Sequence, residues 1–139
     1  MTTTHRYKAA VIIPSRGGAD ILHYPLDALA AQTEKDFQVI VVLDGDIDNS
    51  EAVLDRYIAE GKLNLTKIVF EENRGRVAAL NAGHRAADAD VLIRCDDDLE
   101  PASDYVEAQI RLHRDYDGVI GTLKNVYPDT PYSRVYGNF

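Results

Sequence analysis

Short, wholly apolar runs alternate along the chain with longer stretches in which apolar residues recur every three or four positions. The short runs are rich in Val and Ile and mostly stop at Pro, Gly or Asp, which is typical of buried β-strands. The pattern therefore predicts strands at residues 9–13, 38–43, 66–70, 91–95 and 118–121.

The longer stretches predict helices, because residues three and four positions apart share one helix face. Leu22, Leu26 and Leu29 follow this spacing, and Pro25 marks a helix start or a kink. The remaining helices are expected from an N-cap at Ser50 to a stop at Gly61, after Asn73-Arg74-Gly75, and from Pro101 and Ser103.

Strands that alternate with helices of this length form right-handed βαβ units and a mostly parallel sheet. The predicted fold class is therefore α/β, with the sheet flanked by helices. No linker or repeat divides the chain, so residues 1–139 are expected to form one domain. Residues 122–139 show no clear periodicity and are assigned to no helix or strand.

The composition excludes several classes of protein. The 139 residues carry a formal net charge of −8, which disfavours a nucleic-acid partner held by phosphate contacts. The N-terminus is too polar for a signal peptide, and no apolar run approaches the ~20 residues of a membrane span. The single cysteine, Cys95, allows no intramolecular disulfide and is expected to be a buried structural thiol. We therefore expect a cytoplasmic protein.

Candidate chemistry lies at the ends of the predicted strands. The carboxyl ends of parallel strands meet at one edge of a sheet, and ligands bind outside that edge. Pro14-Ser15-Arg16, Asp44, Asn73-Arg74-Gly75-Arg76 and Asp96-Asp97-Asp98 follow the first four strands in turn.

The triplet Asp96-Asp97-Asp98 is the strongest of these signals. Adjacent carboxylates repel one another, and a cation relieves that repulsion. Mg²⁺ and Mn²⁺ prefer carboxylate oxygens and also bridge phosphates, so the triplet predicts a site for either ion. The alternative is a solvated acidic turn.

Together the strand ends offer carboxylates, several arginines and a metal-type cluster, which suits a nucleoside diphosphate bound with a metal ion. Arg76 lies in the first turn of its predicted helix, where the positive helix end favours a phosphate or base contact. The alternative for Arg76 is a solvated helix residue.

Several motifs occur in order between about residues 9 and 121. They are Val11-Ile12-Ile13-Pro14-Ser15, Leu29-Ala30-Ala31-Gln32-Thr33, Phe37-Gln38-Val39-Ile40-Val41-Val42, Asp44-Gly45, Asn73-Arg74-Gly75 with Asn81-Ala82-Gly83, and Asp96-x-Asp98. The ordered set resembles the nucleotide-binding half of family 2 glycosyltransferases with the Rossmann-like GT-A fold. One departure is Leu43, which stands where the family has the first Asp of Asp-Asp-Gly.

The resemblance implies an inverting glycosyltransferase that uses a nucleotide-diphospho-sugar, with a UDP-sugar favoured, and Mg²⁺ or Mn²⁺. Asp44 would contact the base, the alternative being a turn cap. Asp98 would bind the metal, and Asp96 would meet the ribose or the metal through water, although a register shift would promote Asp97. The implied nucleotide-binding residues are Pro14, Ser15, Arg16, Asp44, Asn73, Arg76, Asp96 and Asp97, with Asp98 and Asp96 as metal ligands.

Such enzymes also need a carboxylate general base, which lies after the Asp-x-Asp motif in the acceptor-binding half. No acidic residue here is marked as that base, and about forty residues follow Asp98, too few for a full acceptor half. The chain is therefore expected to be part of a longer enzyme or a small stand-alone relative, with an unknown hydroxyl acceptor. A non-catalytic module that binds nucleotide and metal stays open. A nucleotidyltransferase is weaker, because Ser15-Arg16-Gly17-Gly18 lacks a longer Gly-rich, Lys-containing signature.

Overall fold

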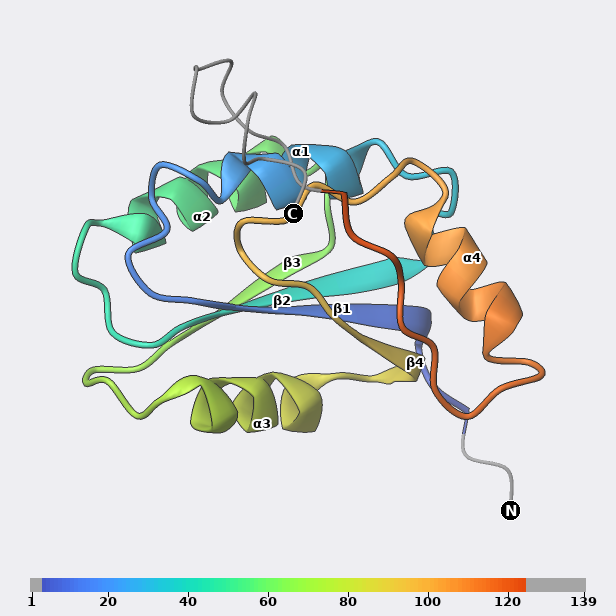
Figure 1. Cartoon of the computed structure of the whole chain (residues 1–139). Helices are drawn as coiled ribbons and strands as arrows, with labels where there is room; N and C mark the ends of the chain where they lie inside the picture. The colour runs from blue at the N-terminus through green and yellow to red at the C-terminus, as the bar shows by residue number, and fades with distance from the viewer. Residues whose placement is uncertain (1–3, 125–139) are drawn as a thin grey trace, which may run out of the picture.

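The computed structural model describes residues 4–124. Within this range, four parallel strands form one sheet in the order β3-β2-β1-β4, flanked by four helices (Figure 1). This arrangement confirms the predicted α/β fold. No helix of the described range is long and apolar enough to cross a membrane. The elements are β1 (Tyr7–Ser15), α1 (His23–Ala30), β2 (Phe37–Leu43), α2 (Ser50–Glu60), β3 (Leu65–Val69), α3 (Arg76–Ala86), β4 (Ala89–Arg94) and α4 (Tyr105–Leu112).

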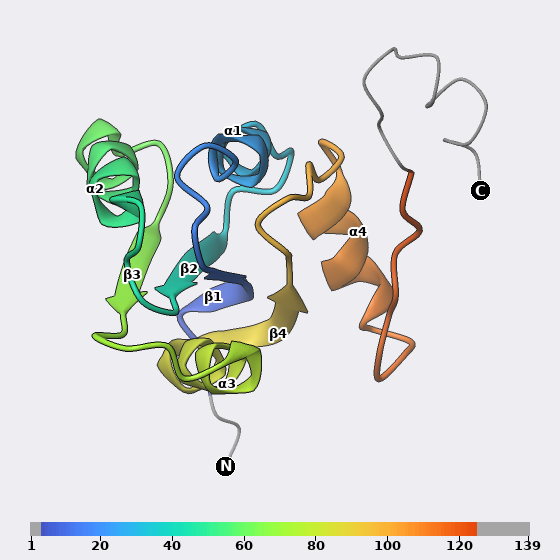
Figure 2. The ribbon, with the colours of Figure 1, turned by 60° about the vertical axis from the view of Figure 1, so that its left-hand side comes forward.

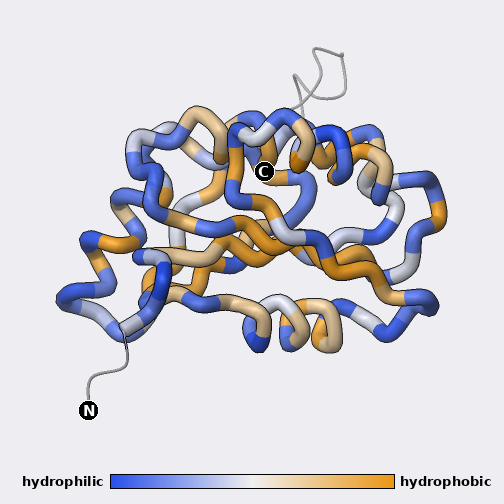
Figure 3. The backbone as a smooth tube through the Cα atoms, turned by 180° about the vertical axis from the view of Figure 1, so that it is seen from behind, coloured by the Kyte–Doolittle hydropathy of each residue, from blue (hydrophilic) through white to orange (hydrophobic). Residues whose placement is uncertain are grey.

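Helices cover both faces of the sheet, and alternate strand residues point to opposite faces. Val11 and Val39 pack toward α1, α2 and α4, whereas Ile12 and Ile40 pack toward α3. Figure 1 and Figure 2 show α1, α2 and α4 on one face of the sheet and α3 on the other. β1 and β2 are central and buried on both faces, which explains their continuous apolar runs. The strands form a mostly hydrophobic middle layer between helices of mixed hydropathy (Figure 3).

β4 lies at one edge of the sheet. Among residues 4–124 it pairs with β1 alone. Val91 and Ile93 are buried in the core, whereas Asp90, Leu92 and Arg94 are exposed on the opposite face. This alternation follows from the position of α3, which packs mainly on β1 and β2.

The start of α2 differs from the prediction. Its N-cap is Asn49, in the left-handed conformation with φ 64°, and Ser50 is the first helical residue. Asp46 Oδ1 accepts a hydrogen bond from the Ser50 N–H at 2.8 Å, and Ser50 Oγ donates to Asp48. These two carboxylates therefore take the capping role predicted for Ser50. The predicted stop at Gly61 is confirmed, with φ 70°.

The prediction of a fifth strand at residues 118–121 is wrong. These residues form no strand, and Ile120 is 98% exposed. The run contains two apolar residues between two glycines, so it has little side-chain surface to bury against the sheet. Residues 125–139, most of the unassigned tail, lie outside the described residues.

Close packing of α3 on β1 depends on Gly83. A Cβ at this position would overlap Cγ2 of Ile12, which is fully buried at the centre of the sheet. Protein interiors are packed densely, so Ile12 could move only by displacing its own neighbours.

Gly83→Ala is therefore expected to lower the free energy of unfolding by about 1–3 kcal/mol, the usual cost of overpacking a core. Helix propensity alone predicts the opposite sign, because Ala is favoured over Gly in a helix by about 1 kcal/mol. Urea unfolding followed by circular dichroism measures the change. Gly118→Ala is the matched control, since nothing lies within 4 Å of a Cβ there. If Gly83→Ala has the same free energy of unfolding as wild type, α3 can move away from the sheet at little cost.

Candidate functional site

The strand order places a topological switch between β1 and β4. β2 and β3 follow β1 on one side, whereas β4 returns to its other side. In open α/β sheets a ligand-binding crevice forms at such a switch, outside the carboxyl ends of the strands. Ser15 ends β1 and the acidic triplet follows β4, so both lie at this switch point, where such a crevice is expected.

A hydrogen bond joins the two strand ends at the switch, because Ser15 Oγ donates to Asp97 Oδ2 at 2.7 Å. Burial raises the pKa of the Asp97 carboxyl above its usual range; the Ser15 hydrogen bond counteracts this in part, and the adjacent carboxylates raise the pKa further. Gly18 makes room for the pair. A Cβ at Gly18 would overlap Ser15 Oγ and lie 3.1 Å from Asp97 Oδ2.

The neighbours of Asp97 have different surroundings. Asp96 Oδ1 forms an ion pair with Arg94, 3.2 Å from its Nη2. Asp98 is exposed, and no side-chain hydrogen bond within residues 4–124 involves its carboxylate. Cys95 is buried, and burial raises the pKa of its thiol to about 12. Cys95 is therefore a structural thiol, as predicted.

Asp44 connects three elements at the same end of the sheet. Its N–H donates to the Ser15 carbonyl at 2.8 Å, so the ends of β1 and β2 are joined. Its carboxylate accepts hydrogen bonds from the N–H groups of Arg74 at 2.6 Å and Gly75 at 3.0 Å, just before α3. The side chain is deeply placed, since Asp44 is only 7% exposed.

The remaining predicted residues lie around this junction. Asn73 Oδ1 accepts a second hydrogen bond from the Gly75 N–H at 2.9 Å. Pro14 precedes Ser15 in β1 and is partly buried, whereas Arg16 and Arg76 are exposed. The structure therefore brings Ser15, Asp44, Asn73 and Asp97 together by hydrogen bonds. Arg16 and Asp98 lie on the connections that leave the ends of β1 and β4, and Arg76 is the first residue of α3 after β3.

Sequence patterns did not single out Gly18, Asp48 or Arg94. Asp48 Oδ2 accepts a hydrogen bond from the Ala19 N–H at 2.9 Å and so joins the loops after β1 and β2. A hydrogen bond from Ser50 lowers the pKa of Asp48. The pairing of Arg94 with Asp96 could have been predicted, because residues two positions apart in an extended chain point to the same side.

The carboxylate oxygens at the switch point are of the type that hard divalent ions prefer. Within the described residues, no group of three or more His, Cys, Asp or Glu side chains is arranged to hold a metal by itself. Mg²⁺ and related ions are commonly held by one or two carboxylates together with substrate phosphates. The exposed Asp98 beside Asp96 offers that partial set of oxygen ligands.

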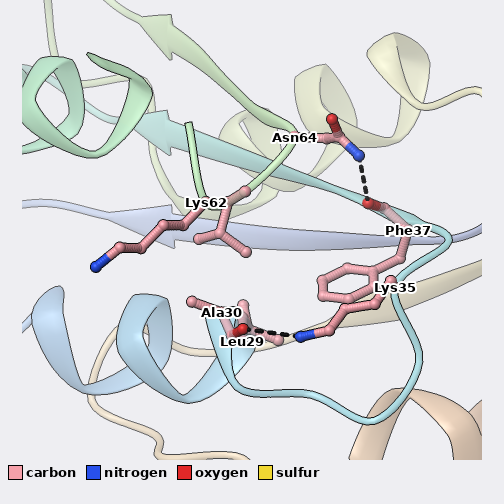
Figure 4. A pocket seen from close by; sticks show the side chains of 7 residues that line it. Leu29, Ala30, Lys35, Phe37, Lys62 and Asn64 are labelled. Atoms are coloured by element: carbon pink, nitrogen blue, oxygen red, sulfur yellow. Dashed lines mark hydrogen bonds between the residues drawn. The ribbon is translucent and has the colours of Figure 1, made fainter. Parts of the chain in front are cut away.

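Two surface hollows lie at the opposite, amino-terminal end of the strands. In the smaller hollow, of about 100 Å³, Lys35 Nζ donates to the Ala30 carbonyl and Asn64 Nδ2 to the Phe37 carbonyl (Figure 4). These polar groups hold neighbouring chain segments together. The larger hollow, of about 520 Å³, lies between the start of β4 and the end of α4. Neither hollow contains a predicted site residue.

The chain is similar in sequence and in fold to known proteins. The family model described as Glycosyl transferase family 2 matches residues 10–137. The uncharacterized glycosyltransferase YfnE of Bacillus subtilis (strain 168) is 33% identical over 114 residues, covering 81% of this chain and 29% of YfnE. The undecaprenyl-phosphate 4-deoxy-4-formamido-L-arabinose transferase of Pseudomonas fluorescens (strain SBW25) is 31% identical over 108 residues, covering 77% of this chain and 31% of that protein.

A solved structure shares the fold. The mannosyltransferase PcManGT from Pyrobaculum calidifontis, in complex with GDP-Man and Mn²⁺, aligns with a TM-score of 0.68 and 27% sequence identity. The alignment covers 76% of this chain and 32% of PcManGT. The alignments therefore span about three tenths of the length of each of these three proteins.

Asp97→Asn is expected to change the pH dependence of stability. The amide oxygen still accepts from Ser15, but the partly buried carboxylate is gone. Because the folded-state pKa of Asp97 is raised above 3.8, its stabilising protonation is complete at low pH and is lost as the pH rises through the folded-state pKa. Relative to wild type, the variant should therefore gain stability as the pH rises from below 3.8 through the folded-state pKa of Asp97.

Urea unfolding across this pH range measures the difference between the two proteins. Ser15→Ala is the companion variant, because it removes the contact that lowers the Asp97 pKa. In Ser15→Ala, the fall in the free energy of unfolding with rising pH should extend to higher pH than in wild type. If the free energy of unfolding depends on pH in the same way in wild type and in Asp97→Asn, the raised pKa of Asp97 is contradicted.

Proposed function

We propose, because the chain belongs to glycosyl transferase family 2, that residues 1–139 form a domain that binds a nucleotide-diphospho-sugar with a divalent metal ion. The sugar would be transferred to a hydroxyl acceptor with inversion. The family model and the relatives confirm the family predicted from the sequence. One observation carries the proposal: the Ser15–Asp97 contact places the acidic triplet beside the polar end of β1, at the switch point.

Asp98, with Asp96 beside it, would hold Mg²⁺ or Mn²⁺ at the end of β4. When bound, such an ion neutralises charge on the departing diphosphate. Asp97 is fixed by Ser15 at 2.7 Å, and this contact restrains the loop that carries the other two carboxylates. The complex of PcManGT with GDP-Man and Mn²⁺ supports the pairing of a nucleotide-sugar with a metal on this fold.

The nucleotide would lie across the ends of β1 and β2, against Pro14, Ser15 and Arg16. Arg76 would contact the diphosphate, because it is exposed in the first turn of α3, where the helix dipole favours an anion. A UDP-sugar remains the favoured donor. A GDP-sugar is the second choice, since PcManGT binds GDP-Man.

Asp98→Ala should make binding of a nucleoside diphosphate independent of metal. Wild type is expected to bind Mn²⁺ weakly alone and more tightly with UDP or GDP, because the phosphates complete the ligand set. Isothermal titration calorimetry with and without Mn²⁺ measures this coupling. Asp90→Ala is the matched control, because Asp90 is exposed near the other end of the same strand. If the affinity of Asp98→Ala for UDP or GDP still depends on Mn²⁺, Asp98 is only a solvated turn residue.

The 139-residue chain alone should bind a nucleotide-sugar but transfer the sugar slowly. None of the carboxylates in residues 4–124 is identified as a general base, and such a base contributes roughly 10²–10⁴-fold. The measurement is nucleotide release from UDP-, GDP- and dTDP-sugars with Mn²⁺, with and without simple sugar acceptors. Fast acceptor-dependent turnover would contradict the expectation that this chain lacks a general base. If the chain binds none of these donors, the proposed function itself is refuted.

A further inference from the structure

The Asp44 carboxylate is occupied by the protein's own backbone. Each of its oxygens accepts a hydrogen bond from one of two consecutive N–H groups, those of Arg74 and Gly75. These donors lie 30 and 31 residues further along the chain. With 7% of the residue exposed, little of the carboxylate surface is left for a ligand.

The segment that Asp44 holds has a specialised conformation. Gly75 has φ 93° and ψ 162°, a region that is open to Gly and strained for other residues. Asn73 Oδ1 also accepts from the Gly75 N–H. Gly45 has φ 86°, which also favours Gly, and the Asn73 nitrogen lies within van der Waals contact of this position, 3.7 Å from where a Cβ would be.

Two arginines depend on this segment. Arg76 follows Gly75 as the first residue of α3, so the position of Gly75 sets where its side chain begins. The Arg74 guanidinium lies 4.6 Å from the centre of the Phe70 ring. Phe70 is itself held to the end of β2, because its N–H donates to the Leu43 carbonyl at 2.9 Å. The backbone clamp and the ring thus restrain Arg74 from both ends.

We propose that Asp44 is a positioning residue, whose carboxylate clamps the backbone of Arg74 and Gly75 so that the two arginines face the diphosphate of the donor. This role rests on the proposed function and replaces the base contact predicted from the sequence. The chain carries a net charge of −8 and three carboxylates at the crevice, so an anionic ligand needs its few cations held in place. Mobile arginines would lose side-chain and backbone freedom on binding, and the clamp removes part of that cost.

Amide hydrogen exchange measured by NMR tests the clamp directly. The Arg74 and Gly75 amides should be protected in wild type. In Asp44→Ala the Arg74 amide should lose protection, and the Gly75 amide should lose less, because Asn73 Oδ1 still accepts from it. Asp44→Asn, which keeps one acceptor oxygen, should show a smaller loss. Arg74 and Gly75 are exposed, so water can solvate the freed N–H groups and the fold should survive. Asp46→Asn is the matched control in the same loop, because Asp46 caps α2 instead. Unchanged amides in Asp44→Ala would overturn the proposal.

Ligand titrations separate positioning from a base contact. With Mn²⁺ present, Asp44→Asn should bind UDP roughly tenfold more weakly, the size of a typical coupling within one network, and bind uridine unchanged. On an Arg74→Ala, Arg76→Ala background the same substitution should cost nothing further. Two results would assign Asp44 to the base and overturn the positioning role alone. One is an equal loss of affinity for uridine and for UDP, and the other is additivity of Asp44→Asn with the two arginine substitutions. If the wild-type protein binds none of UDP, GDP and dTDP, the proposed function is overturned, and the positioning role with it.

Discussion

The hydrogen bonds of Ser15 hold the candidate site together. Ser15 ends the central strand β1, and its carbonyl accepts the Asp44 N–H while its hydroxyl donates to Asp97. Through Asp44 the same network reaches the start of α3, so one residue links the ends of β1, β2 and β4 with that helix. Polar contacts thus join these strand ends to a strand that is itself buried on both faces.

The fold was readable from the sequence because its signals are local. β1 and β2 are buried on both faces, and this burial requires the continuous apolar runs that predict them. The polar residues that follow these runs share one end of the sheet, because parallel strands finish there together. The error at residues 118–121 arose because two apolar residues between glycines resemble a strand locally, whereas a strand exists only with a partner.

The contacts within the site were not readable. Ser15 and Asp97 are 82 residues apart, and Asp44 meets Arg74 across 30 residues. A pattern shows that these residues share an edge of the sheet, but not which atoms meet. The loop around Asp97 also departs from the rule that a carboxylate stays in water, and its raised pKa records that departure. Local rules are commonly broken where a ligand, rather than the fold, is to be satisfied.

The edge position of β4 bears on how copies of the protein behave toward one another. Among residues 4–124, the side of β4 away from β1 presents backbone N–H and C=O groups, which are a template for intermolecular strand pairing. Asp90 and Arg94 flank the exposed Leu92 on this strand. Charged side chains at such an edge are gatekeepers against aggregation, because a second copy would have to desolvate them in order to pair. The alternation that leaves β4 half-buried thus also supplies the charged side chains that disfavour pairing of a second copy along this strand.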